Sequence, residues 1–269
     1  MPIKILKENA LDQLKGRWIK SIFTLIMYTI ILRSSSTIVS ILLSAKHEQL
    51  LAIIQFIVLS LIITMFLTGV MRAGRCRFFL NMTEDYHSAR FVDLFSQFKI
   101  YPKTLLLSLL VQIFSGLWYI PIIVVALIII SIYMISQPIE VIFNIQYYFT
   151  SNRIHTTIMI LISIIVLFII SSIVIQLMYS QAFYILADNP KKSTFACIQE
   201  SRFLMRGNKL KYIGLHLSFI GWYILILIIS VIGSFLLGSV FSDLLLLVGL
   251  LLLEPYIELT KANFYINAN

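Results

Sequence analysis

The sequence predicts an all-α polytopic membrane protein, and three observations support this class. The mean hydropathy of the 269 residues is +0.95, 59% of them are hydrophobic, and only 12% are charged. A soluble domain of this length needs a smaller apolar share to form one core. Six apolar segments are long enough to cross a bilayer, and Lys and Arg gather on one side of them. We therefore expect residues 1–269 to form a single membrane domain.

Six transmembrane helices are predicted from the length of the apolar segments. A bilayer core is about 30 Å thick and a helix rises about 1.5 Å per residue, so a crossing needs about 20 mostly apolar residues. The opening segment lacks a small-residue cleavage site after a short apolar core, so the first span should stay in the mature protein. The predicted spans cover residues 19–43, 50–71, 104–130, 156–182, 212–234 and 244–264.

The distribution of Lys and Arg predicts the orientation of the chain. Five lie before or at the start of the first span, six in the connection 72–103, six in the connection 191–211, and Lys261 near the end of the last span. These make eighteen of the 21 Lys and Arg residues. Because positively charged short loops stay inside, both termini should face the cytoplasm, where the charge favours anionic lipid headgroups. Nucleic-acid binding is not expected, since the charge is divided among connections beside membrane spans.

Three cytoplasmic segments have the apolar periodicity of amphipathic helices that lie in the membrane interface, each before an outward span. The periodicity is helical because the apolar residues recur three and four positions apart. The predicted apolar faces are Leu11, Leu14 and Trp18 in the first segment, Phe91, Leu94, Phe95 and Phe98 in the second, and Phe195, Ile198 and Met205 in the third.

The inward spans end in similar sequences, which indicates a possible threefold repeat of helix hairpins. "MRAGRCRFFLN", "YSQAFYILADN" and "LTKANFYINAN" place Ala73, Ala182 and Ala262 shortly before an aromatic pair and an Asn. The repeat-like units would cover about 1–82, 83–190 and 191–269. We interpret the aromatic pairs as part of the interfacial belt that anchors membrane spans.

The third and fifth predicted spans each combine a tryptophan with a glycine. "GLWYIP" and "IGWYI" place Gly116 beside Trp118 and Gly221 beside Trp222. Small residues let helices approach closely, so we expect these positions to pack in the protein core.

The chain also resembles a known family. "MYSQAFYILADNP", "IQESRFLMRGNK" and "LHLSFIGWYIL", together with "LKGRWIKSI", "FVDLFSQFK" and "PYIELTKANFY", are similar to the bacterial membrane proteins of domain-of-unknown-function family 975. The resemblance spans nearly the whole chain. It implies a six-helix protein of the bacterial plasma membrane and supplies no activity. The family usually has an apolar residue directly before the proline of the last span, where this chain has Glu254.

Five polar residues in the predicted spans are candidates for a midplane cluster. Counting along the helices places Glu254 about 15 Å and Arg33 about 21 Å from the cytoplasmic ends of their spans. A charge near the bilayer centre normally has a partner inside the bundle, so we expect Arg33 and Glu254 to pair. The alternative is that Arg33 extends to the outer surface while a protonated Glu254 bonds to a glutamine. The candidate cluster comprises Arg33, Gln55, Gln112, Gln176 and Glu254.

Glu258 lies one turn nearer the cytoplasm, and we expect it to pair with Lys261, three residues further along the helix. The spacing of the four histidines is not that of metal ligands, and Cys76 and Cys197 lie far apart in the sequence. The sequence contains no nucleophile elbow and no glycine-rich phosphate loop. We therefore expect no catalytic residues, no metal site and no cofactor.

The function that we expect is that of a non-enzymatic, membrane-embedded interaction module. It would bind a lipid, a peptide or a membrane protein in envelope protection, immunity or stress regulation. The alternative is a small transporter or transporter subunit that uses the polar site around Arg33 and Glu254.

Overall fold

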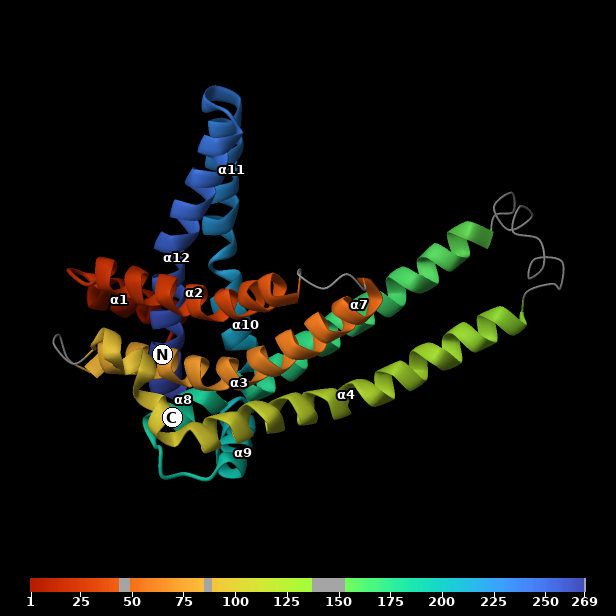
Figure 1. The fold of residues 1–269 in the computed structure, drawn as a ribbon, viewed down its shortest axis with the longest axis horizontal. Coiled ribbons are helices and arrows are strands. Elements are labelled where there is room, and N and C mark those ends of the chain that lie inside the picture. Colours follow the sequence, from red (N-terminus) through yellow and green to blue (C-terminus); the bar gives the residue numbers. More distant parts are fainter. Residues whose placement is uncertain (44–48, 85–88, 137–152, 269) are drawn as a thin grey trace. The chain divides into compact units, whose positions relative to one another are not determined.

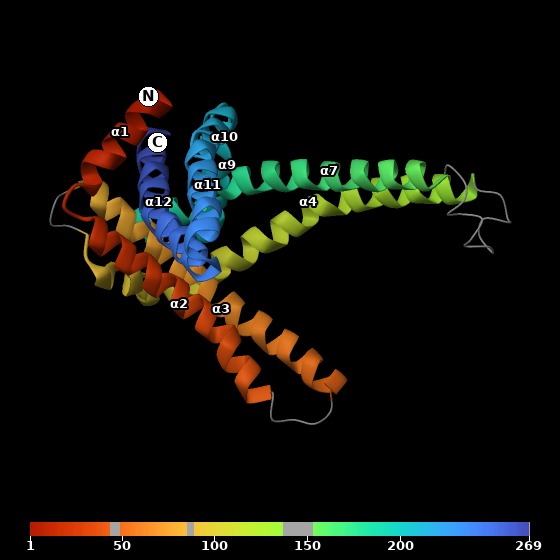
Figure 2. The same ribbon diagram turned by 90° about the horizontal axis from the view of Figure 1, so that it is seen from above.

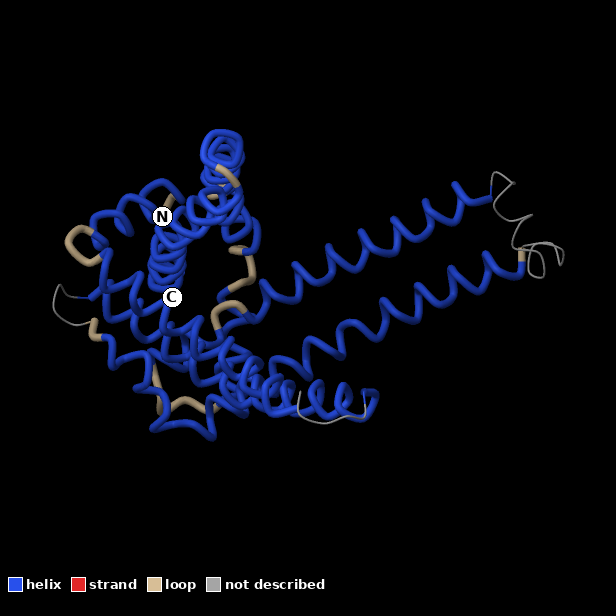
Figure 3. Tube along the Cα trace, turned by 45° about the horizontal axis from the view of Figure 1, so that its top comes forward, coloured by secondary structure: helices blue, strands red, loops and turns tan. Residues whose placement is uncertain are grey.

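The computed structural model describes residues 1–43, 49–84, 89–136 and 153–268, apart from the side chains of 35–53, of some residues between 55 and 64, and of 153, 154 and 237. Its regular structure within these ranges is entirely helical (Figure 3), which confirms the all-α class. The N-terminal half has α1 (Ile3–Leu14), α2 (Trp18–Leu43), α3 (Gln49–Glu84), the 3-10 helix η1 (Phe91–Ile100) and α4 (Tyr101–Ile135). The second half has α7 (Arg153–Tyr179), α8 (Ala182–Asp188), α9 (Thr194–Leu204), α10 (Lys209–Leu217), α11 (Ile220–Leu237) and α12 (Ser239–Ala268).

Four helical segments among the described residues are long and apolar enough to cross a membrane. They are Phe91–Ile135, His155–Asp188, Lys209–Leu236 and Ser239–Ala268. The protein is therefore a multi-pass membrane protein. The first two predicted spans fall on α2 and α3, parts of which have side chains outside the described set, so the total of six spans stays a prediction.

The chain divides into two compact units. One comprises Met1–Leu109 together with Ser180–Asn269, and the other comprises Leu110–Tyr179. The second unit is a hairpin of α4 and α7, seen as the yellow-green and green helices of Figures 1 and 2. Contacts that join its helices include the stacked rings of Tyr119 and Phe168, with centroids 4.8 Å apart, and the Tyr119 hydroxyl, which donates to Ser172 Oγ at 3.0 Å. The hydroxyls of Tyr133 and Thr157 also bond at 2.6 Å.

The helices of this hairpin have apolar side chains exposed on most of their surface. In the most apolar 18-residue window of each segment, the buried share is 0% for Phe91–Ile135 and 6% for His155–Asp188. Trp118 is 46% exposed, and a Cβ added at Gly116 would meet open space. Trp222 in α11 is 48% exposed, and a Cβ at Gly221 would also meet open space. The prediction of core packing at these positions is therefore wrong, because no other described helix covers them.

The buried residues of the larger unit gather at one end of its long helices. In α3 they lie between residues 69 and 82, and in α12 they lie between 253 and 265. α12 contacts α1, α2 and α3 there, whereas its N-terminal half pairs with α11 (Figure 1). The α11–α12 pairing includes Ser230, whose hydroxyl donates to the carbonyl of Ser242 at 2.9 Å. The larger unit thus has a packed core at one end and an apolar hairpin that extends from it.

The three predicted repeat endings contribute to this core. Ala73, Ala182 and Ala262 are each 0% exposed, and α3 contacts both α8 and α12. The small side chains allow this close packing. The aromatic pairs beside them are buried as well, with exposures of 0% for Phe78 and Phe79, 2% for Phe183, 4% for Tyr184, 1% for Phe264 and 2% for Tyr265. Their interpretation as an interfacial belt is therefore wrong, because protein rather than lipid surrounds them.

A glycine fixes the position of η1 against α3. A Cβ added at Gly74 would overlap the backbone carbonyl of Leu94, so only glycine permits this approach. Asp93 holds the start of η1, because its Oδ2 accepts from the Arg90 backbone N–H at 2.7 Å and from Asn81 Nδ2 at 2.9 Å. η1, which lies between α3 and α4 in the chain, is thereby joined to the core.

Candidate functional site

A buried charged cluster joins α3 to α12. Glu258 Oε2 lies 3.5 Å from Arg75 Nε, and Glu258 Oε1 accepts from Lys261 Nζ at 2.9 Å. The side chain of Glu258 is 5% exposed, against 18% for Arg75 and 21% for Lys261. The guanidinium of Arg75 also lies 4.6 Å from the centroid of the Tyr28 ring, a favourable cation–π distance. The predicted pair of Glu258 and Lys261 is confirmed, and Arg75 is a further partner.

Two more arginines of the same stretch tie α3 to α8. Arg72 lies with its guanidinium carbon 4.6 Å from the centroid of the Phe183 ring. Arg77 Nη1 donates to the carbonyl of Ala187 at 3.2 Å. The three arginines of "MRAGRCR" therefore have three different partners. One carboxylate, Glu258, lies next to two cations, Arg75 and Lys261.

Polar bonds also join the ends of the chain to this core. Gln13 Nε2 donates to Asn263 Oδ1 at 3.3 Å, and Asn263 Nδ2 donates to Gln13 Oε1 at 2.7 Å. The Tyr265 hydroxyl donates to Asp188 Oδ2 at 2.9 Å, which links α12 to the end of α8. Because a buried polar group is costly without a partner, these bonds select one arrangement of the helices.

The candidate midplane residues have a different setting. The side chains of Arg33, Gln112, Gln176 and Glu254 are all exposed to the surroundings of the protein, and the side chain of Gln55 lies outside the described residues. Glu254 and Glu258 are thus one helical turn apart on α12 and differ in setting, since only Glu258 is buried. The pairing of Arg33 with Glu254 stays a prediction.

The three predicted interfacial faces are each partly packed and partly exposed. In α1, Leu14 is buried with Leu6 and Ala10, whereas Leu11 is 40% exposed and Trp18 lies at the start of α2. In η1, only Leu94 of the predicted face is fully buried. The three Phe rings of η1 lie in a series that begins in α2 and ends in α4. The successive centroid distances are 5.2, 5.7, 6.3 and 6.3 Å through Phe23, Phe91, Phe95, Phe98 and Tyr101.

The α9 face is divided in the same way. Ile198 and Met205 are buried at 2% and 0% exposure, and Phe195 is 51% exposed. Phe203, which the predicted face did not include, is 70% exposed. The buried members hold each segment on the larger unit, and the exposed members leave an apolar surface. The location of these surfaces in the membrane interface stays a prediction.

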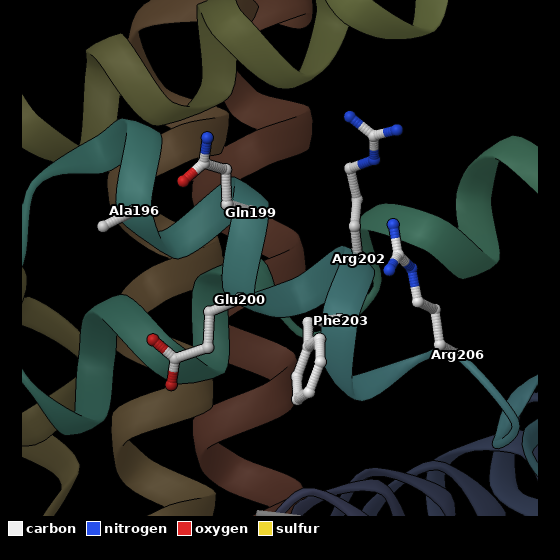
Figure 4. A pocket seen from close by; sticks show the side chains of 6 residues that line it. All are labelled: Ala196, Gln199, Glu200, Arg202, Phe203 and Arg206. Carbon is white, nitrogen blue, oxygen red and sulfur yellow. The ribbon is translucent and has the colours of Figure 1, made fainter.

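Two of the hollows that described residues of the larger unit line are relevant to binding. One has a volume of about 380 Å³ and is lined mainly by α1, where Lys7 Nζ donates to the Ser218 carbonyl at 3.1 Å and lies 4.4 Å from the Phe219 ring centroid. Burial lowers the pKa of Lys7. The other, the α9 groove, has a volume of about 510 Å³ and is lined by Ala196, Gln199, Glu200, Arg202, Phe203 and Arg206 (Figure 4).

The two cysteines are buried as free thiols. Burial raises the pKa of Cys76 to about 12 and also raises the pKa of Cys197. Within the described ranges, no three His, Cys, Asp or Glu residues gather closely enough to hold a metal ion.

Arg75 and the α9 groove are the features that sequence reasoning missed. The i, i+3 spacing of Arg72 and Arg75 directly after an apolar segment was a usable signal, because two cations there need partners or water. The partner of Arg75 lies 183 residues away, however, and nothing in the local pattern identifies it.

The chain was compared with curated proteins, with solved structures and with protein families. No curated protein and no solved structure matches it. One family model matches residues 1–269, which is the whole of the sequence. The all-helical fold with several membrane-spanning helices agrees with the helical membrane protein that the resemblance to family 975 implies. The protein therefore belongs to the family described as "Protein of unknown function (DUF975)".

Proposed function

We propose that the protein is a non-enzymatic, membrane-embedded interaction module that binds a lipid, a peptide or another membrane protein. Its role would lie in envelope protection, immunity or stress regulation. The exposed apolar surface of its long hairpins is the single observation that carries this proposal. A module of this kind needs surfaces within the membrane that its own helices do not cover.

The α11–α12 hairpin illustrates the surface available. The most apolar windows of Lys209–Leu236 and Ser239–Ala268 are each only 22% buried. Ile228 of α11 is 50% exposed, whereas Ser230, two residues on, is 5% exposed against α12. Lipid can cover such helices, and so can the helices of a partner, which pack through van der Waals contacts in a bilayer. The packed core at the other end would hold the hairpin in place while it binds.

Photocrosslinking tests the proposal. A benzoylphenylalanine replaces Ile228 in the full chain in cell membranes, and the same probe at Ser230 is the matched control that faces α12. We expect position 228 to give a discrete adduct whose partner also copurifies with the unmodified chain in native nanodiscs. If the nanodiscs hold the chain alone with lipids in the proportions of the bulk membrane, and position 228 captures only those lipids, the proposal is wrong.

The second candidate function is a small transporter or transporter subunit with a polar site around Arg33 and Glu254. Glu254 and Pro255 in a spanning helix favour this function. A proline in a span frees a backbone carbonyl, which together with the carboxylate of Glu254 gives oxygens that could bind a cation or a proton. Single cysteines at positions 33, 112, 176 and 254, with Cys76 and Cys197 replaced, test the site. Labelling of all four from water on one side of intact cells would support transport. Failure of all four to label, in chains that insert normally, would exclude a hydrated site.

A further inference from the structure

We propose that the α9 groove binds the phosphate of an anionic phospholipid at the membrane surface. This inference rests on the proposed function above and names one ligand of that interaction module. Three features of the groove carry it: its charge, the apolar side chains beside it, and its place in the chain directly before a membrane-spanning segment.

The charge of the groove comes from two arginines that have no side-chain partner among the described residues. Figure 4 shows Gln199, Arg202 and Arg206 extending to one side of the helix in that view, with Glu200 and Phe203 extending to the other. In the part of the chain that the structure describes, Arg202 and Arg206 form no salt bridge and no hydrogen bond through their side chains. A guanidinium presents several N–H donors in a fixed plane, which suits the oxygens of a phosphate.

The one carboxylate that lines the groove does not neutralise these arginines. Both oxygens of Glu200 accept from Lys192 Nζ at 2.7 Å. The side chains of this pair are 27% exposed for Glu200 and 34% for Lys192. Since Glu200 is matched by its own lysine, the groove retains the charge of Arg202 and Arg206. Its complement is an anion that offers at least two acceptor oxygens, as the phosphodiester of a phospholipid does.

Apolar side chains next to the arginines favour a lipid over a soluble anion. Phe203 is 70% exposed and lies between Arg202 and Arg206 in the sequence, and Leu210 is 82% exposed just beyond them. An exposed Phe and Leu beside arginines are typical of segments that insert their apolar side chains between headgroups while the cations meet phosphates. A groove for a free metabolite would gain nothing from exposing these two side chains.

The position of the groove in the chain places it at the level of the headgroups. Arg206 precedes α10 by three residues, and α10 leads through two residues into α11. The segment Lys209–Leu236 is one of the four that are long and apolar enough to cross a membrane. The phosphates of a bilayer lie where such a segment enters it, so Arg202 and Arg206 need no separate movement to reach them.

Native mass spectrometry of the full chain in detergent measures the binding directly. The probes are a phosphatidylglycerol and a phosphatidylcholine with the same acyl chains. We expect phosphatidylglycerol to bind more tightly than phosphatidylcholine. A double variant with Arg202→Gln and Arg206→Gln should weaken the binding of phosphatidylglycerol by about 30-fold, because each arginine near an anionic headgroup contributes about fivefold to the affinity. A double variant with Lys20→Gln and Lys99→Gln, which removes the same charge at two other exposed sites, is the matched control.

Three results would overturn the inference. The first is equal binding of the two lipids, and the second is an equal loss of phosphatidylglycerol binding in the control variant. The third is displacement of phosphatidylglycerol by inorganic phosphate at millimolar concentration, which would identify a site for a free anion. A Phe203→Ser variant should lower the affinity for both lipids and leave their ratio unchanged. The arginine double variant is also tested with the crosslinker at position 228. If this variant keeps the crosslinked partner and binds phosphatidylglycerol as tightly as the unsubstituted chain, this inference fails while the proposed function stands.

Discussion

Glu258 Oε2 lies 3.5 Å from Arg75 Nε, so two residues 183 positions apart in the sequence form a buried pair that joins the last helix to the third. Lys261 completes the arrangement from the same side of α12. A buried ion pair contributes little net free energy of folding, but the loss of one member leaves the others charged and desolvated. The first prediction follows from this asymmetry.

Replacing Glu258 by Gln should lower the free energy of unfolding by about 3–5 kcal/mol, because Arg75 and Lys261 then lack a counter-charge. Thermal unfolding of the purified chain in detergent measures the change. Glu254→Gln is the matched control on the same helix and should change the unfolding temperature little, since Glu254 is exposed. Equal unfolding temperatures for Glu258→Gln and the unsubstituted protein would contradict the role of the pair. A triple variant, Arg75→Met with Glu258→Leu and Lys261→Met, removes all three charges and should recover much of the loss.

Gly74→Ala should destabilise the protein by about 1–3 kcal/mol or more, since the added methyl overlaps the carbonyl of Leu94 and forces η1 away from α3. Gly116→Ala makes the same chemical change where the Cβ meets open space, and helix propensity predicts that it is neutral or slightly stabilising. Both variants can be compared by thermal unfolding. A Gly74→Ala protein as stable as the Gly116→Ala protein would show that η1 does not pack against α3 in this way.

Cys76 and Cys197 should react slowly with a maleimide in the folded protein. The thiolate is the reactive form, and burial raises the pKa of Cys76 to about 12, so the neutral thiol predominates at pH 7. The rate should rise about tenfold per pH unit below that pKa, as the thiolate fraction does. A Leu210→Cys variant, with its exposed position, should label readily under the same conditions, and both native cysteines should label after denaturation. Rapid labelling of Cys76 at neutral pH would contradict its burial.

Tyr265→Phe should lower the free energy of unfolding by about 1 kcal/mol, because the hydroxyl of the buried Tyr265 donates to the carboxylate of Asp188, an exposed residue at the end of α8. Tyr223→Phe, at a residue that is 41% exposed on α11, should have little effect. Urea or thermal unfolding of the two variants gives the comparison. The prediction fails if both substitutions have the same effect.

The sequence was a good guide to the elements of the fold and a poor one to their surroundings. Apolar length predicted helices that could cross a membrane, and the i, i+3 spacing of Glu258 and Lys261 predicted their pair, because both are local properties. The aromatic pairs were misassigned since an interfacial belt and a protein core require the same side chains at the same place in a helix. Only the approach of α3, α8 and α12, which are far apart in the chain, distinguishes the two.

The candidate sites show the same limit. Arg75 was counted as a topology signal, and its partner could not be identified without the contact between α3 and α12. Arg202 and Arg206 were likewise counted as part of the positive charge of a connection. Within the described ranges they have no side-chain partner, whereas Glu200 binds Lys192. This difference depends on the local folding of the 191–211 connection, which residue counts do not describe.

The contact of α12 with α1, α2 and α3 has a consequence for the order of events during synthesis. α12 leaves the ribosome after α1, α2 and α3, because it follows them in the chain. Each hairpin can enter the bilayer as it emerges, but Arg75 of α3 and the apolar face of α1 wait for residues 253–265 before they are covered. A chain that stops before α12 would keep its early helices in the membrane with a charged, open core, and membrane proteases would recognise that state. Truncation before α12 is thus expected to shorten the lifetime of the chain in the membrane, and a pulse-chase comparison with the full chain measures this.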